Sequence, residues 1–231
     1  MWLVNSSVGR KVVMSVTGIA LILFLTFHMA MNLVAIFSER GYNAVCEFLG
    51  ANWYAVVASM GLAALFIIHI IYAIWLTLQN RKARGSERYA VTERPKTVEW
   101  ASQNMLVLGL IVVIGLALHL INFWYRMQFA ELANDQVLAL GGDFADGAGL
   151  MHVTFGNPIF TILYLVWFVV IWFHLTHGFW SALQTLGWNN QIWIKRWKCI
   201  SNIYTTILMA CFALVVIVMF IKAHLCGAAC I

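Results

Sequence analysis

The chain has 231 residues, of which 63% are hydrophobic and only 10% are charged, with a formal net charge of +5. Because a soluble domain carries about 25% charged residues, this composition excludes a soluble globular protein and predicts an integral membrane protein. The sign of the net charge is less informative than the placement of the charges along the chain. We expect membrane lipid as a partner and no nucleic acid.

Five apolar runs are long enough to cross a bilayer, whose hydrocarbon core of about 30 Å needs about 20 helical residues. We therefore expect an all-α membrane protein in which 1–231 forms a single transmembrane domain. The first run is long and has no small-residue cleavage site, so no cleavable signal peptide is expected. The predicted spans are about 12–37, 53–78, 104–125, 158–186 and 202–223.

The connections between these runs differ in charge. Residues 79–99 form the most charged stretch of the chain and contain Pro95, which predicts a solvated segment. Residues 126–157 are acidic, with a short surface helix expected at Met127 to Leu138. Residues 187–201 are basic and rich in tryptophan, as interfacial anchors are. The predicted connections are residues 1–11, 38–52, 79–99, 126–157 and 187–201.

Lysine and arginine lie mostly on one side of this predicted topology. The N-terminal segment, residues 79–99 and residues 187–201 together hold 11 of the 14. Arg40, Arg126 and Lys222 are the other three. The positive-inside rule then places the N-terminus in the cytoplasm and the C-terminus outside, which for a bacterial protein means the cytoplasmic membrane.

Each of the first four runs contains one histidine at a similar distance from its start. His28, His69 and His174 lie 16 positions into their runs, and His119 lies 15 positions into its run. Successive runs cross the membrane in opposite directions. His28 and His119 should therefore share a depth near the outer face, and His69 and His174 a depth near the cytoplasmic face. The two layers would be roughly 15–20 Å apart.

Two histidines at one depth on two helices are what a six-coordinate haem iron needs. Such ligation leaves no open position, so the site transfers electrons and does not bind oxygen. The small residues Gly115 and Gly178 lie one turn from His119 and His174 and would leave room for a flat macrocycle. Packing between membrane helices is the other explanation for the glycines. For a lone histidine, the other explanation is a hydrogen bond between helices.

His177 is a second possible ligand in the fourth run, one turn from His174. It lies closer to the headgroups than the matched depth, so His174 is preferred. His177 would then contact a haem propionate or serve packing. His152 and His224 are expected to be solvated or interfacial.

These residues resemble the membrane-anchor cytochromes b of succinate:quinone oxidoreductases, in their five-helix form with two haems. The resemblance covers nearly the whole chain and includes a fifth span without a central histidine. In that family the ligand stands four residues before the glycine of the fourth-span motif, which supports His174. The matching strings are Ser7-Val8-Gly9-Arg10-Lys11, Leu25-Thr26-Phe27-His28-Met29 and His174-Leu-Thr-His-Gly-Phe-Trp-Ser181.

The resemblance implies a subunit that has no activity on succinate or fumarate by itself but belongs to a succinate dehydrogenase or fumarate reductase complex. The first four helices would form a bundle around two b haems, bound by His69 with His174 on the inner side and by His28 with His119 on the outer side. A flavoprotein and an iron–sulfur protein would dock on the basic cytoplasmic face. A membrane quinone, with menaquinone suiting two haems, would be the redox partner.

A quinone site needs a proton acceptor, and Glu47 is the best candidate. It lies near the outer haem in depth, among Phe48, Leu49 and Trp53. An ordinary loop acid is the competing interpretation. Candidate propionate donors, chosen by depth, are Arg10, Lys11 and Arg81 or Lys82 for the inner haem and Trp124, Arg126 or Asn32 for the outer haem.

One absence also bears on mechanism. Some two-haem members of that family carry a glutamate two residues before the fourth-span ligand, as a proton relay. The corresponding residue here is Trp172, and the first four runs have no carboxylate in their cores. We therefore expect no proton path by that route and an electrogenic reaction.

Two other functions fit the same histidines. An anchor cytochrome b of a hydrogenase or formate dehydrogenase would keep the haems and change the partner subunits. A proton-coupled transporter would use the histidines as relays, but it is expected to have acidic partners or interrupted helices.

Overall fold

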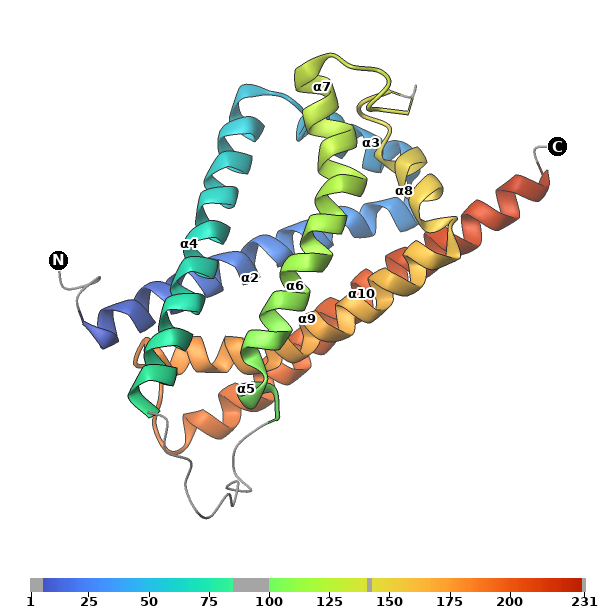
Figure 1. Ribbon diagram of the computed structural model, residues 1–231. Helices are drawn as coiled ribbons and strands as arrows, with labels where there is room; N and C mark the ends of the chain where they lie inside the picture. The colour runs from blue at the N-terminus through green and yellow to red at the C-terminus, as the bar shows by residue number, and fades with distance from the viewer. Residues whose placement is uncertain (1–5, 85–99, 141–142, 230–231) are drawn as a thin grey trace.

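The computed structural model describes residues 6–84, 100–140 and 143–229, and within these ranges it contains helices and turns but no strand (Figure 1). Five helical segments are long and apolar enough to cross a membrane. The prediction of an all-α protein with five membrane-length helices is therefore confirmed. The segments are α2 (Ser7–Phe37), α4 (Trp53–Arg84), α6 (Met105–His119) with its continuation, α9 (Pro158–Thr185) and α10 (Trp193–Ala229).

Two of these helices begin earlier than predicted because polar side chains cap them. α2 begins inside the expected polar start, where Ser6 Oγ accepts a hydrogen bond of 2.9 Å from the Gly9 N–H. α10 begins at Trp193, inside the expected basic connection. There the Asn190 side chain accepts from the Trp193 N–H at 2.8 Å. The basic residues of both segments are thus helical, since an N-cap satisfies the first free N–H groups.

Two segments predicted as loops also contain helices. α3 (Glu39–Phe48) follows Ser38, whose hydroxyl accepts from the Gly41 N–H at 3.0 Å. α8 (Gly147–Phe155) follows Asp146, whose carboxylate accepts from the Gly149 N–H at 2.9 Å. α3 and α8 pack against each other and cover one end of the long helices (Figure 1).

The third long segment changes its helical geometry partway. α6 ends at His119 and continues as a π-helix, η1 (Leu120–Phe129), and then as the short α7 (Ala130–Ala133). Asn134 ends α7 in a left-handed conformation with φ 51°, so the surface helix expected at Met127 to Leu138 is wrong. A π-helix is rare and often occurs at a functional site. Here it begins directly after a candidate ligand.

Four of the long helices form a ring. Around it, α2 packs against α4, α4 loosely against α6, α6 against α9, and α9 against α2. α2 therefore lies diagonally across from α6, and α4 diagonally across from α9. The short α5 (Trp100–Gln103) precedes α6 and packs on α9.

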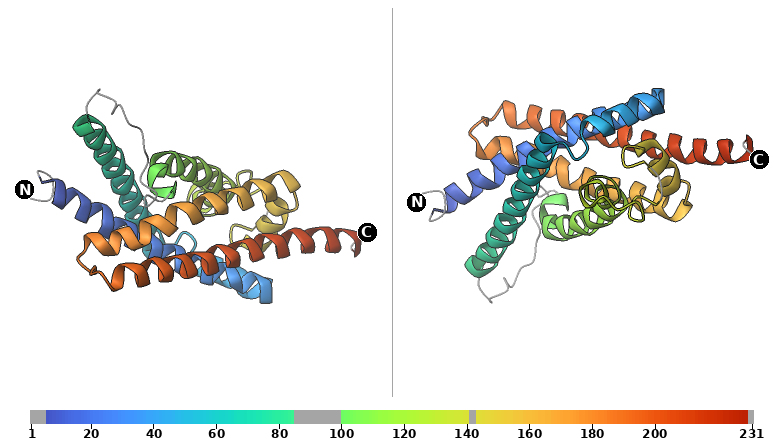
Figure 2. Two further views of the ribbon diagram at one scale, coloured as in Figure 1. Left: turned by 90° about the horizontal axis from the view of Figure 1, so that it is seen from below. Right: turned by 90° about the horizontal axis from the view of Figure 1, so that it is seen from above.

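α10 stands outside the ring, alongside α9 for most of its length (Figure 2). Apolar side chains of α9 and α10 form most of the buried core. Tyr164 and Phe168 of α9 pack with Leu208 and Phe212 of α10. By contrast, α4 contributes Ala55 as its one buried side chain among the described residues. The fifth helix thus buttresses α9, and α4 is the most exposed member of the ring.

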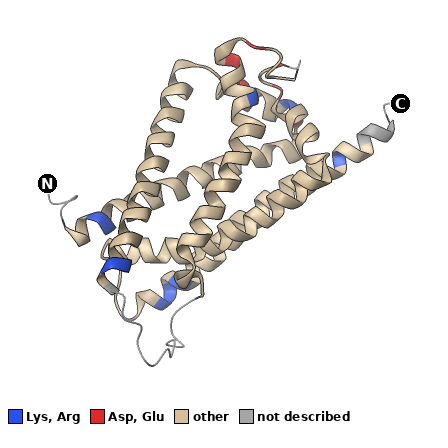
Figure 3. Cartoon of the chain, viewed as in Figure 1, with Lys and Arg blue, Asp and Glu red and all other residues tan. Residues whose placement is uncertain are grey.

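The charges are distributed unequally between the two ends of the bundle. Lysine and arginine gather where α2 and α10 begin and α4 ends, and the acidic residues lie at the opposite end, around α7 (Figure 3). Arg88, Arg94 and Lys96, which contribute to the predicted basic face, lie outside the described residues.

Candidate functional site

The four candidate histidines occupy the four helices of the ring in two diagonal pairs. His28 on α2 and His119 at the end of α6 form one pair, and His69 on α4 and His174 on α9 form the other. The two helices of a diagonal pair stand on opposite sides of the four-helix ring. Bundles place cofactor ligands on facing helices of this kind.

The first pair lies in direct contact. The ring centres of His28 and His119 are 5.7 Å apart, with the ring planes at 85°. A metal–imidazole bond is about 2 Å long, so two imidazoles on opposite sides of one ion have ring centres roughly 6 Å apart. The observed separation therefore fits a pair of axial ligands to a single iron.

Aromatic rings surround this first pair. Phe24 stacks on His28 at 5.6 Å, and Phe212 of α10 lies 5.9 Å from the same ring. On the other side, His119 contacts Phe123 at 5.2 Å. Tyr164 and Trp167 of α9 complete the group around His119. Such surroundings leave the two imidazoles in an apolar environment.

The second pair is held differently. The Nδ1 atom of His69 lies 3.0 Å from the Thr17 hydroxyl of α2. The Nδ1 atom of His174 is buried and has no hydrogen-bond partner among the described residues. A buried ring nitrogen without a partner costs about 1–3 kcal/mol, so this atom has hydrogen-bonding capacity that the described residues leave unused.

Two glycines that were not predicted from the sequence lie against the second pair. A Cβ atom on Gly18 of α2 would come within 3.3 Å of His69 Cε1, and one on Gly109 of α6 would lie 3.7 Å from His174 Cε1. At this level the four-helix ring therefore alternates glycine and histidine, with Gly18 on α2, His69 on α4, Gly109 on α6 and His174 on α9. Each glycine stands ten residues before the histidine of its own helix, and this repeated spacing is the sequence signal that would have revealed both.

The two glycines chosen from the sequence behave differently. A Cβ on Gly115 would collide with the Trp167 indole, whose N–H donates to the Val112 carbonyl at 3.2 Å. Gly115 therefore serves the packing of α6 on α9, which is the other explanation given for this glycine. A Cβ on Gly178 would meet no atom of the described residues within 4 Å, so this glycine faces open space.

His177 lies beside the second pair, near the basic end of α9. Its ring contacts Trp180 edge-on at 5.0 Å. The Lys198 ammonium of α10 lies 4.3 Å from the Trp180 ring. His177 therefore belongs to an aromatic and cationic group at the end of the bundle, where a propionate contact is sterically reasonable.

Glu47 lies in surroundings more polar than expected. It is exposed on α3 and lines a pocket of about 500 Å³. A second carboxylate, Glu131 of α7, lines the same pocket and accepts a hydrogen bond of 2.8 Å from the Ala51 N–H. The pocket is lined by Ala44, Glu47, Phe48, Asn52, Tyr54 and Glu131.

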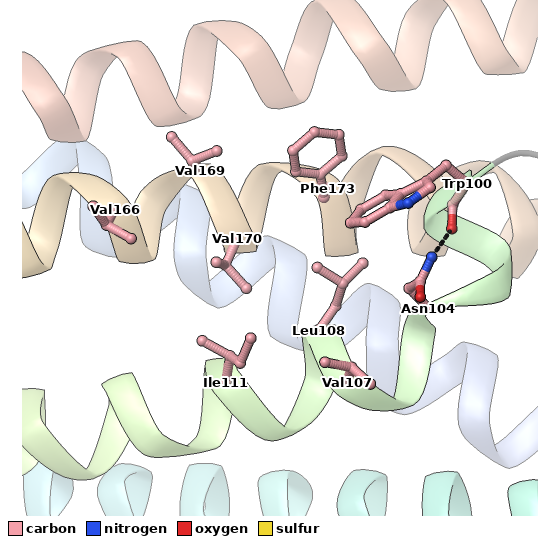
Figure 4. Close-up of a pocket in the computed structure, with 9 residues that line it drawn as sticks. All are labelled: Trp100, Asn104, Val107, Leu108, Ile111, Val166, Val169, Val170 and Phe173. Carbon is pink, nitrogen blue, oxygen red and sulfur yellow. Dashed lines mark hydrogen bonds between the residues drawn. The ribbon is translucent and has the colours of Figure 1, made fainter.

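An apolar hollow lies at the other end of the bundle, between α6 and α9. Its volume is about 350 Å³, and Asn104 provides an amide at one end (Figure 4). Phe173, the neighbour of His174 in sequence, packs on Trp100 at 5.2 Å there. An aliphatic chain would fit this lining. The hollow is lined by Trp100, Asn104, Val107, Leu108, Ile111, Val166, Val169, Val170 and Phe173.

Several candidate propionate donors already have protein partners. The Arg10 guanidinium donates to Gln79 Oε1 at 3.0 Å and lies over the Trp75 ring. Asn32 donates to the His28 carbonyl at 2.7 Å. Trp124 donates to Gln128 Oε1 at 2.7 Å. Lys11, Arg81 and Lys82 share the end of the bundle at which Arg10 lies, and Arg126 lies within η1.

A charged group at the acidic end was also not predicted from the sequence. Glu39 Oε1 lies 3.0 Å from the Lys222 ammonium of α10 and 3.2 Å from His152 Nε2 of α8. Lys222 donates further to the Ala35 and Ile36 carbonyls at the end of α2. His152 therefore contacts the Glu39 carboxylate and is not simply solvated. Sequence separations of 113 and 183 residues from Glu39 left no local signal for these contacts.

No protein-family model, curated protein or solved structure matches this chain. Its function is therefore inferred from the residues and their geometry.

Proposed function

We propose that this chain is the membrane-anchoring dihaem cytochrome b subunit of a succinate:quinone oxidoreductase. The observation that supports it best is the arrangement of four histidines as two diagonal pairs in a four-helix ring. A six-coordinate haem needs one ligand on each face, and helices on opposite sides of a ring supply them without crowding the macrocycle edge.

In this proposal His28 and His119 hold the outer haem, and His69 and His174 hold the inner haem. Each haem, when bound, accepts and releases one electron at a time. The aromatic side chains around His28 and His119 would make the outer site apolar. Gly18 and Gly109 place no side chain of their own against the inner imidazoles.

The charge distribution supports an orientation and a docking face. The basic end faces the cytoplasm, with the N-terminus there and the C-terminus outside, in accordance with the positive-inside rule. This end would receive the flavoprotein and iron–sulfur subunits of a bacterial cytoplasmic-membrane complex. Binding of anionic lipid is compatible with the same face.

The pocket that contains Glu47 is the proposed quinol site, with menaquinone as the preferred quinone. Glu47 is exposed and would accept a quinol proton, and Glu131 lines the same pocket. Glu131 is tied to the Ala51 backbone, so it also fixes the position of the turn that leads into α4.

Purification of the intact complex with haem quantitation tests the proposal. Two b haems per chain are expected, with one lost in each of the variants His119→Ala and His174→Ala. His224→Ala is the matched control, because His224 contacts Phe220 of its own helix and should retain both haems. Unchanged haem content in both ligand variants would contradict the proposal.

The same preparation separates the alternatives. A protein without a reduced-minus-oxidised haem spectrum would be better explained as a histidine-dependent transporter. If hydrogenase or formate dehydrogenase subunits were present in the purified complex, the haem assignment would stand. The partner enzyme would then be one of these in place of succinate dehydrogenase or fumarate reductase.

A further inference from the structure

The Thr17 hydroxyl has a defined direction. Thr17 is 5% exposed, and its Oγ1 lies 2.9 Å from the Val13 carbonyl and 3.0 Å from the Met14 carbonyl of its own helix. A hydroxyl has one hydrogen, which these two backbone acceptors share. With its hydrogen on one of these carbonyls, the same oxygen can accept a hydrogen bond from His69 Nδ1, which lies 3.0 Å away.

This geometry favours one tautomer of His69. When Thr17 accepts, the proton of a neutral His69 ring lies on Nδ1, and the lone pair lies on Nε2. Gly18 adds a steric constraint, since its missing side chain leaves only enough room for the ring at Cε1. Two consecutive residues of α2 thus hold the imidazole of α4 in one orientation.

His174 lacks the equivalent contact. Its Nδ1 has no partner in the part of the chain that the structure describes, and Gly109 faces its ring without a neighbouring hydroxyl, since the residue before Gly109 is Leu108. The two proposed ligands of the inner haem therefore differ in hydrogen bonding.

We propose that Thr17 is a positioning residue for His69, acting through the Nδ1 hydrogen bond to present Nε2 to the inner haem iron. This inference rests on the proposed function. A hydrogen bond accepted from the distal ring N–H raises the basicity of the ligand, which stabilises ferric iron and lowers the reduction potential. Loss of such a contact typically weakens metal binding by about 10–100-fold.

The test compares Thr17→Val with Thr17→Ser in the purified complex, by potentiometric titration of the haem spectra and by electron paramagnetic resonance. Valine keeps the shape and removes the acceptor, and serine keeps it. We expect Thr17→Val to raise the potential of one haem, to change its low-spin signal and to weaken its retention. We expect Thr17→Ser to keep the potential, the low-spin signal and the retention of that haem at their wild-type values. The other haem should be unchanged in both variants.

A second pair of variants guards against a folding defect in Thr17→Val. Gly18→Ala should displace the His69 ring and change the signal of the same haem. Gly61→Ala on α4 is the control, because the added Cβ would meet no atom of the described residues within 4 Å, and it should leave the His69 ring and the haem signal unchanged. If the wild-type complex contains two haems but the signals are unaltered in both Thr17→Val and Gly18→Ala, the inference about Thr17 is overturned and the proposed function stands. Wild-type complex without haem would overturn the proposed function.

Discussion

Lys222 shows how one residue can join three elements. Its ammonium group lies against two carbonyls that end α2, and against the Glu39 carboxylate of α3. Free carbonyls at a helix C-terminus carry partial negative charge, so a cation there is stabilising. The Lys222 ammonium lowers the pKa of Glu39 from its ordinary value of 4.5, against the opposing effect of partial burial.

The first prediction concerns this group and its pH dependence. A carboxylate with a lowered pKa stabilises the fold at neutral pH, and the contribution is lost as the pH falls through that lowered pKa, below 4.5. Because the Glu39 side chain is 40% exposed, the contribution should not exceed about 1 kcal/mol. Lys222→Met should lower the thermal unfolding temperature of the detergent-solubilised protein at pH 7.

The carboxylate partner provides the control for that prediction. In a protein that already carries Glu39→Gln, the further change Lys222→Met should have most of its effect removed, because the ion pair is then absent before and after the change. An equal loss of stability from Lys222→Met at pH 7 and at a pH well below the lowered pKa of Glu39 would show that the ion pair contributes nothing and that the carbonyl contacts alone matter.

Among the elements, η1 has a helical geometry that hydropathy could not predict. The five apolar runs follow from bilayer thickness, which imposes a length on any spanning helix. Helical type does not follow, because hydropathy depends on apolar content and not on the backbone hydrogen-bond pattern. α3 and α8 were missed for another reason. Their helices are short and depend on caps and mutual packing, as Ser38 and Asp146 illustrate.

The second prediction concerns Gln128, a buried residue of η1. Its amide donates to the Gly50 carbonyl at 3.0 Å and accepts from the Ser59 hydroxyl at 2.8 Å and from Trp124. Gln128→Leu would leave these groups unsatisfied, at a cost of about 1–3 kcal/mol. Thermal unfolding should show the loss, with Ser59→Ala as the matched control that removes one bond. A smaller effect from Gln128→Leu than from Ser59→Ala would contradict this role.

At the scale of the whole molecule, the histidines were predictable and their supports were not. Counting positions from the start of each run gives the depth of a residue, because helical rise is constant. It does not give neighbours, so the diagonal arrangement of α2 with α6 and of α4 with α9 appears only in three dimensions. Thr17, Gly18 and Gly109 were missed because their importance depends on which helix faces them.

The third prediction concerns charge movement across the membrane, and it rests on the proposed function. Trp172 occupies the place of a possible proton relay, and its indole N–H donates to Thr206 of α10 at 2.9 Å, away from the ring. We therefore expect electron transfer across the bilayer without a compensating proton path through this position. A potential-sensitive dye in sealed vesicles should report a potential during turnover. Turnover that proceeds with no potential would contradict the prediction.

The ten-residue interval between Gly18 and His28, repeated between Gly109 and His119, sets the distance along the helix between the two histidine levels. Ten helical residues rise about 15 Å and turn the side chain to a face about 80° away, so one helix addresses two different neighbours at two depths. Inserting a residue within either interval would change both the height and the direction of one level relative to the other. The length of this interval should therefore tolerate no insertion or deletion.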